Sequence, residues 1–373
     1  MIKDTFLKAY FQLRLANFTF MEKMQYDVLG VMSGTSLDGI DLAFIKFQFK
    51  DSWEYQIITA DTLPYPAGWQ KRLSEAISYK EHQLQELNEE YTQFLAETIS
   101  SFLTRNQIQE LDAICSHGHT IKHEPENGYT LQIGNLPELA KLTGRKVVCD
   151  FRVQDVELGG QGAPLVPIGD ELLFPEYQYC LNLGGFANVS TVLNDQRVAY
   201  DICPVNTVLN FLAGKLNLAY DKNGEIAASG TTNEALLQQL NALEFYSLKP
   251  PKSLGIEWVN KHIFPMLATE ENIPTLLNTF TVHAAIQISK IFDDKPNSKV
   301  LVTGGGAFNK FLMDEIRKRT KNQIVIPSPK VINFKEALIF GFLGVLKLRN
   351  EVNVLSSVTG ASKDHSSGVI YDV

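Results

Sequence analysis

Short apolar segments that end in polar, glycine-containing turns recur along the chain. Tyr26–Val31 and Asp41–Phe49 are two such segments, and the turn MSGTSLDG joins them, which predicts a β-hairpin. Further on, Tyr177–Leu183 ends in Gly184-Gly185, and Asn188–Leu193 follows as the returning strand. Because the same order of strand, turn and strand occurs twice, we expect two similar halves whose turns face one cleft.

Apolar residues that recur at spacings of three and four predict the helices. The clearest helix is Glu81–Arg105, which carries one continuous apolar face. Further helices are expected from Asn135 to Gly144, from Asn206 onward, and at Asn233–Phe245, Pro274–Phe292, Lys310–Thr320 and Phe334–Arg349. Other strands are expected at Leu111–Cys115, Lys146–Cys149, Arg197–Ile202 and Ser298–Thr303. This alternation of strands and helices predicts an α/β fold.

Length and composition agree with a globular chain of two lobes. The chain has 373 residues, of which 45% are hydrophobic and 20% charged, so each lobe can bury a core. The net charge of −8 makes nucleic acid and anionic membranes poor partners. None of the four cysteines stands in a CxxC motif, so we expect buried, reduced thiols and a cytoplasmic location.

The first residues form an apolar segment that is interrupted by charges such as Lys3 and Arg14. They lack the clean apolar stretch and cleavage site of a signal peptide, and they are too charged to span a bilayer. Met21 or Met24 is an alternative start. We therefore interpret residues 1–25 as an N-terminal extension.

The turn between the first two strands has the composition of a phosphate-binding loop. Gly34 and Gly39 allow the backbone to approach a ligand closely, and Ser33, Thr35 and Ser36 add hydroxyl donors. Asp38 can hold Mg²⁺, directly or through water, because hard cations prefer oxygen ligands. An ordinary polar hairpin loop is the alternative. No GxxxxGK[ST] motif occurs, which excludes a P-loop NTPase.

Two later turns resemble the first one in composition. NLGGFANVS contains Gly184, Gly185 and Asn188, and TGGGAFN contains Gly304, Gly305 and Gly306. TGGGAFN stands between a strand and a helix, where free N–H groups and the helix dipole favour an anion or a ribose. Three such turns at strand ends indicate a nucleotide site more strongly than any single turn.

The motifs together resemble a known family. VMSGTSLDGIDLAFI, SHGHT, LQIGN, DFRVQDVELGGQGAPLVP, NLGGFANVS, PPKSLG, TGGGAFN, EALIFGFL and SVTGAS occur in that order from Gly30 to the C-terminus. They are similar to the motifs of anhydro-N-acetylmuramic acid kinases, which belong to the actin/hexokinase/Hsp70 superfamily. GTSLDGID and GGQGAPLVP are the most specific of them.

The resemblance implies a fold and a reaction. The fold would be two RNase H-like lobes with mixed sheets, flanked by helices, around a central cleft, with residues 26–150 and 340–373 in the first lobe and residues 151–339 in the second. The enzyme would use ATP and Mg²⁺ to open 1,6-anhydro-N-acetylmuramic acid with water and phosphorylate O6, which gives N-acetylmuramic acid 6-phosphate in peptidoglycan recycling. Its partners would be the sugar and ATP, and a homodimer is left open.

The resemblance also implies which residues bind ATP. The matching segment of the first turn and the two later turns supply them: Gly34, Thr35, Ser36, Leu37, Asp38, Gly39, Ile40, Asp41, Gly184, Gly185, Asn188, Gly304, Gly305 and Gly306.

The general base of the family lies in a D-[TC]-G-P-G-N segment, which matches DICPVN here. The resemblance therefore implies that Asp201 removes a proton from the attacking water, while an N-cap of the following helix is the alternative role. Cys203 and Val205 replace the two glycines of the motif. Since valine does not adopt the positive φ that glycine tolerates, the backbone of this loop is expected to differ.

The sugar site is expected between the lobes. Candidates that resemble the family's sugar-site segments are Arg152, Asp155, Gln161, Gly162 and Glu336, each of which has a structural alternative as an interlobe or helix-end contact. The histidines of SHGHT…HEP, namely His117, His119 and His123, have a spacing that suits a metal, but the resemblance implies none there.

Two other functions remain open from the sequence. The replaced glycines leave room for another sugar or carboxylate phosphotransferase of the same superfamily. A non-catalytic sugar-binding protein on this fold is the third possibility, although it would be expected to carry damaged phosphate turns, and all three turns are intact.

Overall fold

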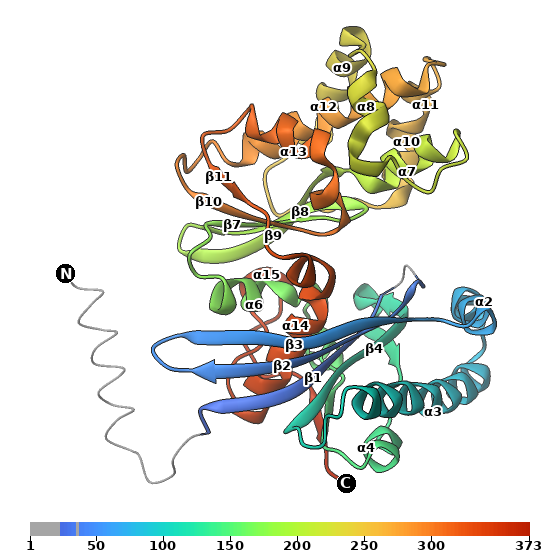
Figure 1. Cartoon of the computed structure of the whole chain (residues 1–373), viewed down its shortest axis with the longest axis vertical. Helices are drawn as coiled ribbons and strands as arrows, with labels where there is room; N and C mark the ends of the chain where they lie inside the picture. Colours follow the sequence, from blue (N-terminus) through green and yellow to red (C-terminus); the bar gives the residue numbers. More distant parts are fainter. Residues whose placement is uncertain (1–22, 35–36) are drawn as a thin grey trace.

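The structure is a computed structural model that describes residues 23–34 and 37–373. Two β-sheets lie one above the other, with helices around them (Figure 1). The first sheet contains β1 (Gln25–Ser33), β2 (Gly39–Phe49), β3 (Trp53–Pro64), β4 (Ala113–Glu124), β5 (Tyr129–Ile133), β6 (Val147–Cys149) and β12 (Val369–Tyr371). The second contains β7 (Tyr179–Leu183), β8 (Phe186–Leu193), β9 (Gln196–Pro204), β10 (Lys299–Thr303) and β11 (Gln323–Val325).

The two sheets repeat one topology. The first has the order β3-β2-β1-β4-β6, in which β1, β2 and β3 are antiparallel and β4 and β6 run parallel to β1. The second has the matching order β9-β8-β7-β10-β11 with the same directions. This duplicated order confirms the predicted α/β class with two RNase H-like mixed sheets. β12 adds an antiparallel edge strand to β6, so the chain ends beside the first sheet.

Helices surround both sheets. They are α2 (Ala67–Glu75), α3 (Glu81–Arg105), α4 (Glu138–Thr143), α5 (Val153–Glu157), α6 (Val166–Leu173), α7 (Asn206–Gly214), α8 (Glu225–Ser229), α9 (Glu234–Asn241), α10 (Ile256–His262), α11 (Phe264–Leu267), α12 (Ile273–Ile291), α13 (Lys310–Arg317), α14 (Pro329–Leu348) and α15 (Ser356–Thr359). The expected helix Glu81–Arg105 is confirmed to the residue, and α12 differs from its expected bounds by one residue at each end.

Several sequence-based boundaries are wrong: the helix expected at Asn233–Phe245, for example, ends as α9 at Asn241. Three wrong boundaries have a local reason. Helix α14 begins at Pro329 instead of Phe334, because Ser328 accepts the backbone N–H of Val331 and Pro329 favours the first helical position. Helix α4 begins at Glu138, and Asn135 does not cap it; its side chain donates to the carbonyl of His117 instead.

The third wrong boundary concerns the motif SHGHT. It was expected after the end of a strand, but it lies inside β4, which continues to Glu124. Gly118 within it has a φ of +74°, and the pairing of β1 with β4 shifts register between Val31 and Ser33 at this level. A bulge at glycine therefore lets the strand continue through a polar motif.

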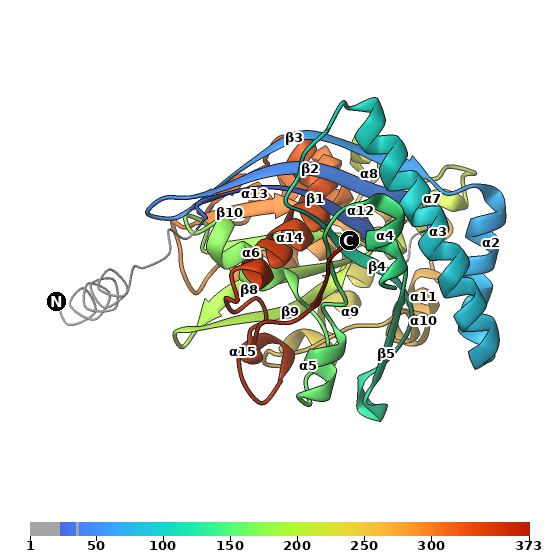
Figure 2. The same ribbon diagram turned by 90° about the horizontal axis from the view of Figure 1, so that it is seen from below.

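Helix α14 passes close against β1, as both views show (Figures 1 and 2). The contact is backbone to backbone, because a Cβ built on Gly30 would lie 2.0 Å from the carbonyl oxygen of Ala337. Gly341 and Gly344 extend the same contact along α14, the latter against Cys115. The apolar core of the first sheet and α14 also includes Leu301 of the second sheet, so the sheets share part of one core.

The four cysteines are buried and form no disulfide, as expected. Among the described residues, every helix is too short or too polar to cross a lipid bilayer.

Candidate active site

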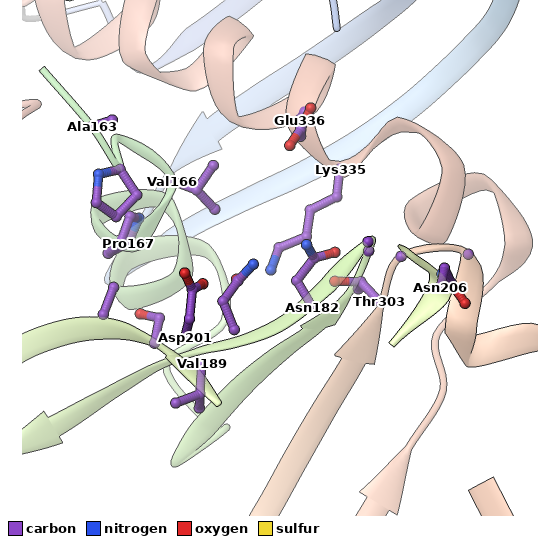
Figure 3. Close-up of a pocket in the computed structure, with 18 of the residues that line it drawn as sticks. Ala163, Val166, Pro167, Asn182, Val189, Asp201, Asn206, Thr303, Lys335 and Glu336 are labelled. Carbon is purple, nitrogen blue, oxygen red and sulfur yellow. The ribbon is translucent and has the colours of Figure 1, made fainter. Parts of the chain in front are cut away.

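A cavity of about 1300 Å³ receives side chains from both sheets. Strands β7, β8, β9 and β10 form one wall, and the start of α14 lies opposite (Figure 3). The predicted site residues that line the cavity are Asp38, Asp41, Gln161, Gly184, Gly185, Asn188, Asp201, Gly304, Gly305 and Glu336. Residues separated by almost 300 positions in the sequence thus meet at one place.

Other predicted residues lie outside the lining of this cavity. Ile40 is fully buried in the core against α3, and Gly39 pairs tightly with β3, since its Cβ would lie 2.6 Å from the carbonyl of Leu63. Also outside the lining are Gly34, Leu37, Arg152, Asp155, Gly162 and Gly306. Thr35 and Ser36, two of the expected ATP contacts, lie outside the described residues.

The two glycine turns of the second sheet lie side by side, because β7 and β10 are parallel neighbours. Gly304 has a φ of +80°, and a Cβ on it would lie 2.5 Å from Oδ1 of Asn182. Gly305, by contrast, has open space in front of it, with the nearest atom, Nδ2 of Asn206, at 3.8 Å. Asn206 also donates to the carbonyl of Leu183, which ties the start of α7 to the first of these turns. The result is an exposed backbone surface without side chains, as an approaching phosphate requires.

Asp201 stands on β9 at the sheet side of the cavity (Figure 3). Its Oδ2 accepts a hydrogen bond of 2.8 Å from the backbone N–H of Leu254. Burial raises the pKa of Asp201, and the Leu254 N–H opposes this rise. A carboxylate with a raised pKa is a stronger base, which suits proton abstraction near neutral pH.

Val205 shows which backbone conformation this chain adopts where the family motif has its second glycine. Its φ is −131° and its side chain is fully buried, so this position requires no positive φ in this chain. The backbone N–H of Val205 donates to the carbonyl of Gly185 over 2.8 Å. The valine therefore fixes the loop against the first glycine turn of the second sheet.

Asp41 lies at the start of β2, next to the end of the first turn. Its Oδ1 accepts the hydroxyl of Thr62 at 2.5 Å. Burial raises the pKa of Asp41 to about 6, and the negative charges of Asp38 and Glu336 act in the same direction. These three carboxylates repel one another, so a cation among them would relieve the repulsion.

Whether the site suits Mg²⁺ depends on how many oxygen ligands these carboxylates can offer. No group of three His, Cys, Asp or Glu side chains in residues 23–34 and 37–373 has the spacing of a metal site. Asp38 and Asp41 offer oxygen ligands, but a Mg²⁺ ion here would need phosphate oxygens and water for the remainder of its octahedron. This is the usual arrangement when the ion arrives with a nucleotide, so the residues fit the group.

Lys335 and Glu336 lie on the cavity side of α14. Burial raises the pKa of Glu336, while the positive charges of Arg152 and Lys335 lower it. Lys335 forms a buried ion pair with Asp170 of α6, in which Nζ lies 2.6 Å from Oδ1. The ammonium is therefore already neutralised at the edge of the cavity.

Arg152 is engaged by protein groups behind the cavity. Its Nε donates to Nε2 of His117 at 2.8 Å, and its Nη1 donates to the carbonyl of Gly162 at 2.6 Å. Since Nε2 of His117 accepts, Nδ1 carries the proton and donates to the carbonyl of Gly118. Burial lowers the pKa of Arg152 to about 10, whereas Glu336 and Asp155 raise it. Arg152 thus supports Glu336 electrostatically.

Asp155 is fully buried and supports the loop that carries Gln161. One carboxylate oxygen accepts the N–H of Gly162, and the other accepts the hydroxyl of Thr359, each at 2.7 Å. Both oxygens are thereby used inside the protein. Gln161, Ala163 and Pro164 are the members of this loop that line the cavity, and Asp155 is not among them.

The three histidines of the HxHxxxH pattern have separate protein partners. His119 bonds through Nδ1 to Ser33 at 2.7 Å, and His123 bonds through Nδ1 to Thr130 at 3.0 Å. Burial lowers the pKa of His119 to about 4, so its imidazole is neutral near pH 7. His119 and Ser33 belong to a buried chain of hydrogen bonds that continues to Tyr65 and Tyr91, behind the first turn.

Several residues that line the cavity were not predicted as site residues from the sequence. They are Thr62, Asp170, Asn182, Asn206, Thr207, Asn210, Lys252, Ser253 and Lys335. Signals existed for several of them. Asn182, Asn206, Lys252 and Ser253 stand in the motifs NLGGFANVS, DICPVN and PPKSLG, and Asp170 and Lys335 are charged residues inside the apolar runs VPIGDELLF and VINFKEALIF. A charge that must be buried in a helix is expected to have a partner, and these two partner each other.

Sequence comparison with known proteins identifies the family of this chain. The family model described as anhydro-N-acetylmuramic acid kinase matches residues 26–373. The chain is 35% identical over 370 residues to a protein of Pseudomonas savastanoi pv. phaseolicola named anhydro-N-acetylmuramic acid kinase, with 93% of this chain and 100% of that protein covered. It is 34% identical to the protein of that name from Haemophilus influenzae, with 94% and 98% covered.

Among solved structures, the activator of the 2-hydroxyisocaproyl-CoA dehydratase from Clostridium difficile with bound ADPNP aligns with a TM-score of 0.43 and 11% identity. That alignment covers 87% of this chain and 97% of that one. The family follows instead from the sequence relatives, which match over almost their whole length and carry one shared name. The chain therefore belongs to the anhydro-N-acetylmuramic acid kinase family.

Proposed function

We propose that this protein is an ATP-dependent kinase that opens 1,6-anhydro-N-acetylmuramic acid with water and phosphorylates O6. The product would be N-acetylmuramic acid 6-phosphate, in the recycling of peptidoglycan. One observation carries the proposal: a half-buried carboxylate, Asp201, shares a cavity with the glycine turns Gly184-Gly185 and Gly304-Gly305 in a chain of this family. Such a cavity holds both parts of the reaction, a base and a phosphate site.

In the proposed reaction, Asp201 accepts a proton from the water that attacks C1. The bond between C1 and O6 breaks as the bond from C1 to the water oxygen forms. O6 then bonds to the γ-phosphorus, and the bond from that phosphorus to ADP breaks. The water proton ends on Asp201, so the charges balance.

The glycine turns would bind the phosphates of ATP through backbone N–H groups. Gly305 is the position at which an added Cβ would meet open space, so it is the place for the closest approach of a phosphate. Asp38 and Asp41 would hold a Mg²⁺ ion together with phosphate oxygens, and the ion would supply charge neutralisation at the transferred group. Glu336, supported by Arg152, would contact the sugar or the reacting water.

The organisation around this reaction is also proposed. Residues 26–150 with 340–373, and residues 151–339, would act as two lobes that close over the ligands and trap the one reacting water. The sugar and ATP are the small-molecule partners. We further propose a cytoplasmic location, where ATP is available, and a homodimer.

The test is to run the reaction in ¹⁸O-water with ATP, Mg²⁺ and the anhydro-sugar. The reaction is stopped early, and the product is reduced with borohydride, because reduction fixes the oxygen at C1. Mass spectrometry is expected to find ¹⁸O at C1 and an unlabelled phosphate bridge at O6. Product without label, or no product, would contradict the proposal.

The same assay separates the other two candidate functions. A different phosphotransferase would turn over ATP with N-acetylglucosamine or acetate and not with the anhydro-sugar. A sugar-binding protein would bind the anhydro-sugar in calorimetry and form no product with ATP.

A further inference from the structure

Residues 250–254, the 250–254 loop, run alongside the end of β9 and touch Asp201 twice. The backbone N–H of Asp201 donates to the carbonyl of Lys252 over 2.9 Å. The backbone N–H of Leu254 donates to the side-chain Oδ2 of Asp201 over 2.8 Å. The loop therefore binds both the main chain and the carboxylate of the same residue, while Lys252 and Ser253 form part of the cavity wall.

A second set of contacts fixes the 250–254 loop from behind. Nζ of Lys252 donates to the carbonyl of Phe245 over 2.9 Å and lies 4.5 Å from the centre of that ring. Phe245 is buried and packs on Trp258 of α10 with ring centres 5.4 Å apart. The short helix η4 (Glu244–Ser247) and α10 thus enclose the loop between them, with the Lys252 ammonium as the link.

The two contacts leave Asp201 with one occupied oxygen and one available oxygen. Oδ2 receives the Leu254 N–H, whereas none of the residues that the structure describes donates a hydrogen bond to Oδ1. A carboxylate held in this way cannot rotate without losing a hydrogen bond to a charged acceptor. Its second oxygen is then fixed in direction, which a base needs in order to meet a water molecule.

We propose that the 250–254 loop is a positioning element for Asp201, in which the Leu254 N–H orients the carboxylate and stabilises its ionised form, and Lys252 anchors the loop. This inference rests on the proposed function. It adds that the carboxylate is oriented by a backbone donor outside the DICPVN segment. Leu254 and Lys252 act through Asp201 and are positioning residues.

Several charged groups share the cavity with Asp201 and this donor. The titratable groups that line the cavity with Asp201 are Lys252 on the loop, Tyr200 on β9, His123 on β4, Asp170 on α6, Lys335 and Glu336 on α14, and Asp38 and Asp41 before and at the start of β2. On β9 itself, Cys203 is fully buried. Burial has the largest effect on the pKa of Asp201 and raises it. The hydrogen bond from the Leu254 N–H acts in the opposite direction and lowers the pKa.

The decisive experiment removes this N–H and measures kcat/KM against pH. Leu254→Pro has no N–H, and Leu254→Ala keeps it and serves as the matched control for the lost side chain. A backbone ester at residue 254, made with the α-hydroxy analogue of leucine, removes the N–H with little change in shape. The acid limb of the profile is expected to move up by about one pH unit in the proline and ester proteins and to stay in Leu254→Ala.

The anchor is tested separately with Lys252→Met, which keeps the apolar stem and loses the donor to Phe245. Its kcat is expected to fall at least about tenfold, while KM for ATP changes less than about twofold, because the loop no longer holds the carboxylate in place. Lys249→Met, one residue before the loop, is the control.

The outcomes are distinguishable from failure of the proposed function. If the wild-type protein forms no labelled product, the proposed function fails. If the wild-type protein is active but the ester protein is folded and keeps its acid limb, only the positioning role is overturned. An acid limb that moves equally in Leu254→Ala would also overturn it, since the N–H is intact there.

Discussion

Nζ of Lys335 lies 2.6 Å from Oδ1 of Asp170, and the two side chains are only 8% and 3% exposed. Lys335 belongs to α14 and Asp170 to α6, so the pair joins two helices beside the cavity. Each charge depends on the other for its stability in a buried place. The folded protein therefore needs both side chains of the pair or neither of them.

Removing one member of this pair is expected to destabilise the protein strongly. Lys335→Met should lower the free energy of unfolding by about 3–5 kcal/mol, because it leaves the Asp170 carboxylate buried without its cation. The double variant Lys335→Met/Asp170→Leu should recover most of that loss. Denaturant unfolding measures both, and Lys50→Met is the control, since its ion pair with Glu54 is more than half exposed and contributes little. A single variant as stable as the wild type would contradict a shared role.

Asp201→Asn is expected to separate binding from chemistry. The amide keeps the shape and can still accept the Leu254 N–H, so calorimetry should find ATP and sugar affinities within about threefold of the wild type. The rate should fall roughly 10²- to 10⁴-fold, because the amide cannot accept the water proton. Asp293→Asn, which changes an exposed carboxylate after α12, is the control. Unchanged turnover in Asp201→Asn would remove the base from this position.

Substitution by alanine is expected to have different effects on stability and on ATP binding at two neighbouring glycines. Gly304→Ala should destabilise the fold by about 1–3 kcal/mol, because the residue has a φ of +80° and its Cβ would lie 2.5 Å from Asn182. Gly305→Ala should leave the melting temperature unchanged, since its Cβ meets no atom closer than 3.8 Å. Its KM for ATP should rise about tenfold or more, because the methyl group blocks a backbone contact to phosphate. Equal ATP affinity in Gly305→Ala would argue against a phosphate at this turn.

The charge of Asp41 is expected to make stability depend on pH. Its pKa is raised from 3.8 to about 6, so the folded protein holds the proton more tightly than the unfolded chain does. Below about pH 4, Asp41 does not change the free energy of unfolding. Its contribution becomes unfavourable as the pH rises to about 6 and stays unfavourable above that pH. Asp41→Asn should therefore gain on the order of 1–2 kcal/mol at about pH 7 and nothing at about pH 4.

Thermal unfolding at the two pH values, without nucleotide, measures this difference. The amide introduced by Asp41→Asn would still accept the Thr62 hydroxyl, so the comparison isolates the charge. Asp61→Asn on the neighbouring strand, which changes an exposed carboxylate, is the control. A gain in Asp41→Asn that is equal at both pH values would contradict the raised pKa.

Much of the fold was predictable because its signals are local. The apolar face of Glu81–Arg105 is continuous and defines α3 to the residue, and the repeat of strand and glycine turn anticipated two matching sheets. The start of α14 was missed because the cap at Ser328 and Pro329 stands before the apolar run begins. A capping signal read together with Pro329 would have placed it.

The candidate site was only partly predictable, because its geometry depends on contacts distant in sequence. The glycine turns and Asp201 stand in recognisable motifs, and they line the cavity. Asp155 stands in an equally recognisable motif, yet its carboxylate is used by Gly162 and Thr359, which lies about 200 residues later. The sequence shows that a carboxylate is present; only the tertiary structure shows which groups already occupy its oxygens.

Helix α14 contributes side chains to the cores of both sheets. Ile332 belongs to the core of the second sheet, whereas Val331 and buried residues from Ala337 onward belong to the core of the first sheet, and Ala337 contacts Gly30. Its backbone departs from helical geometry at Phe334, with φ −117° and ψ 18°, directly before Lys335 and Glu336. A rotation of one sheet against the other would load α14 from both cores, and Phe334, two residues before Glu336, is the place where its backbone already departs from helical geometry.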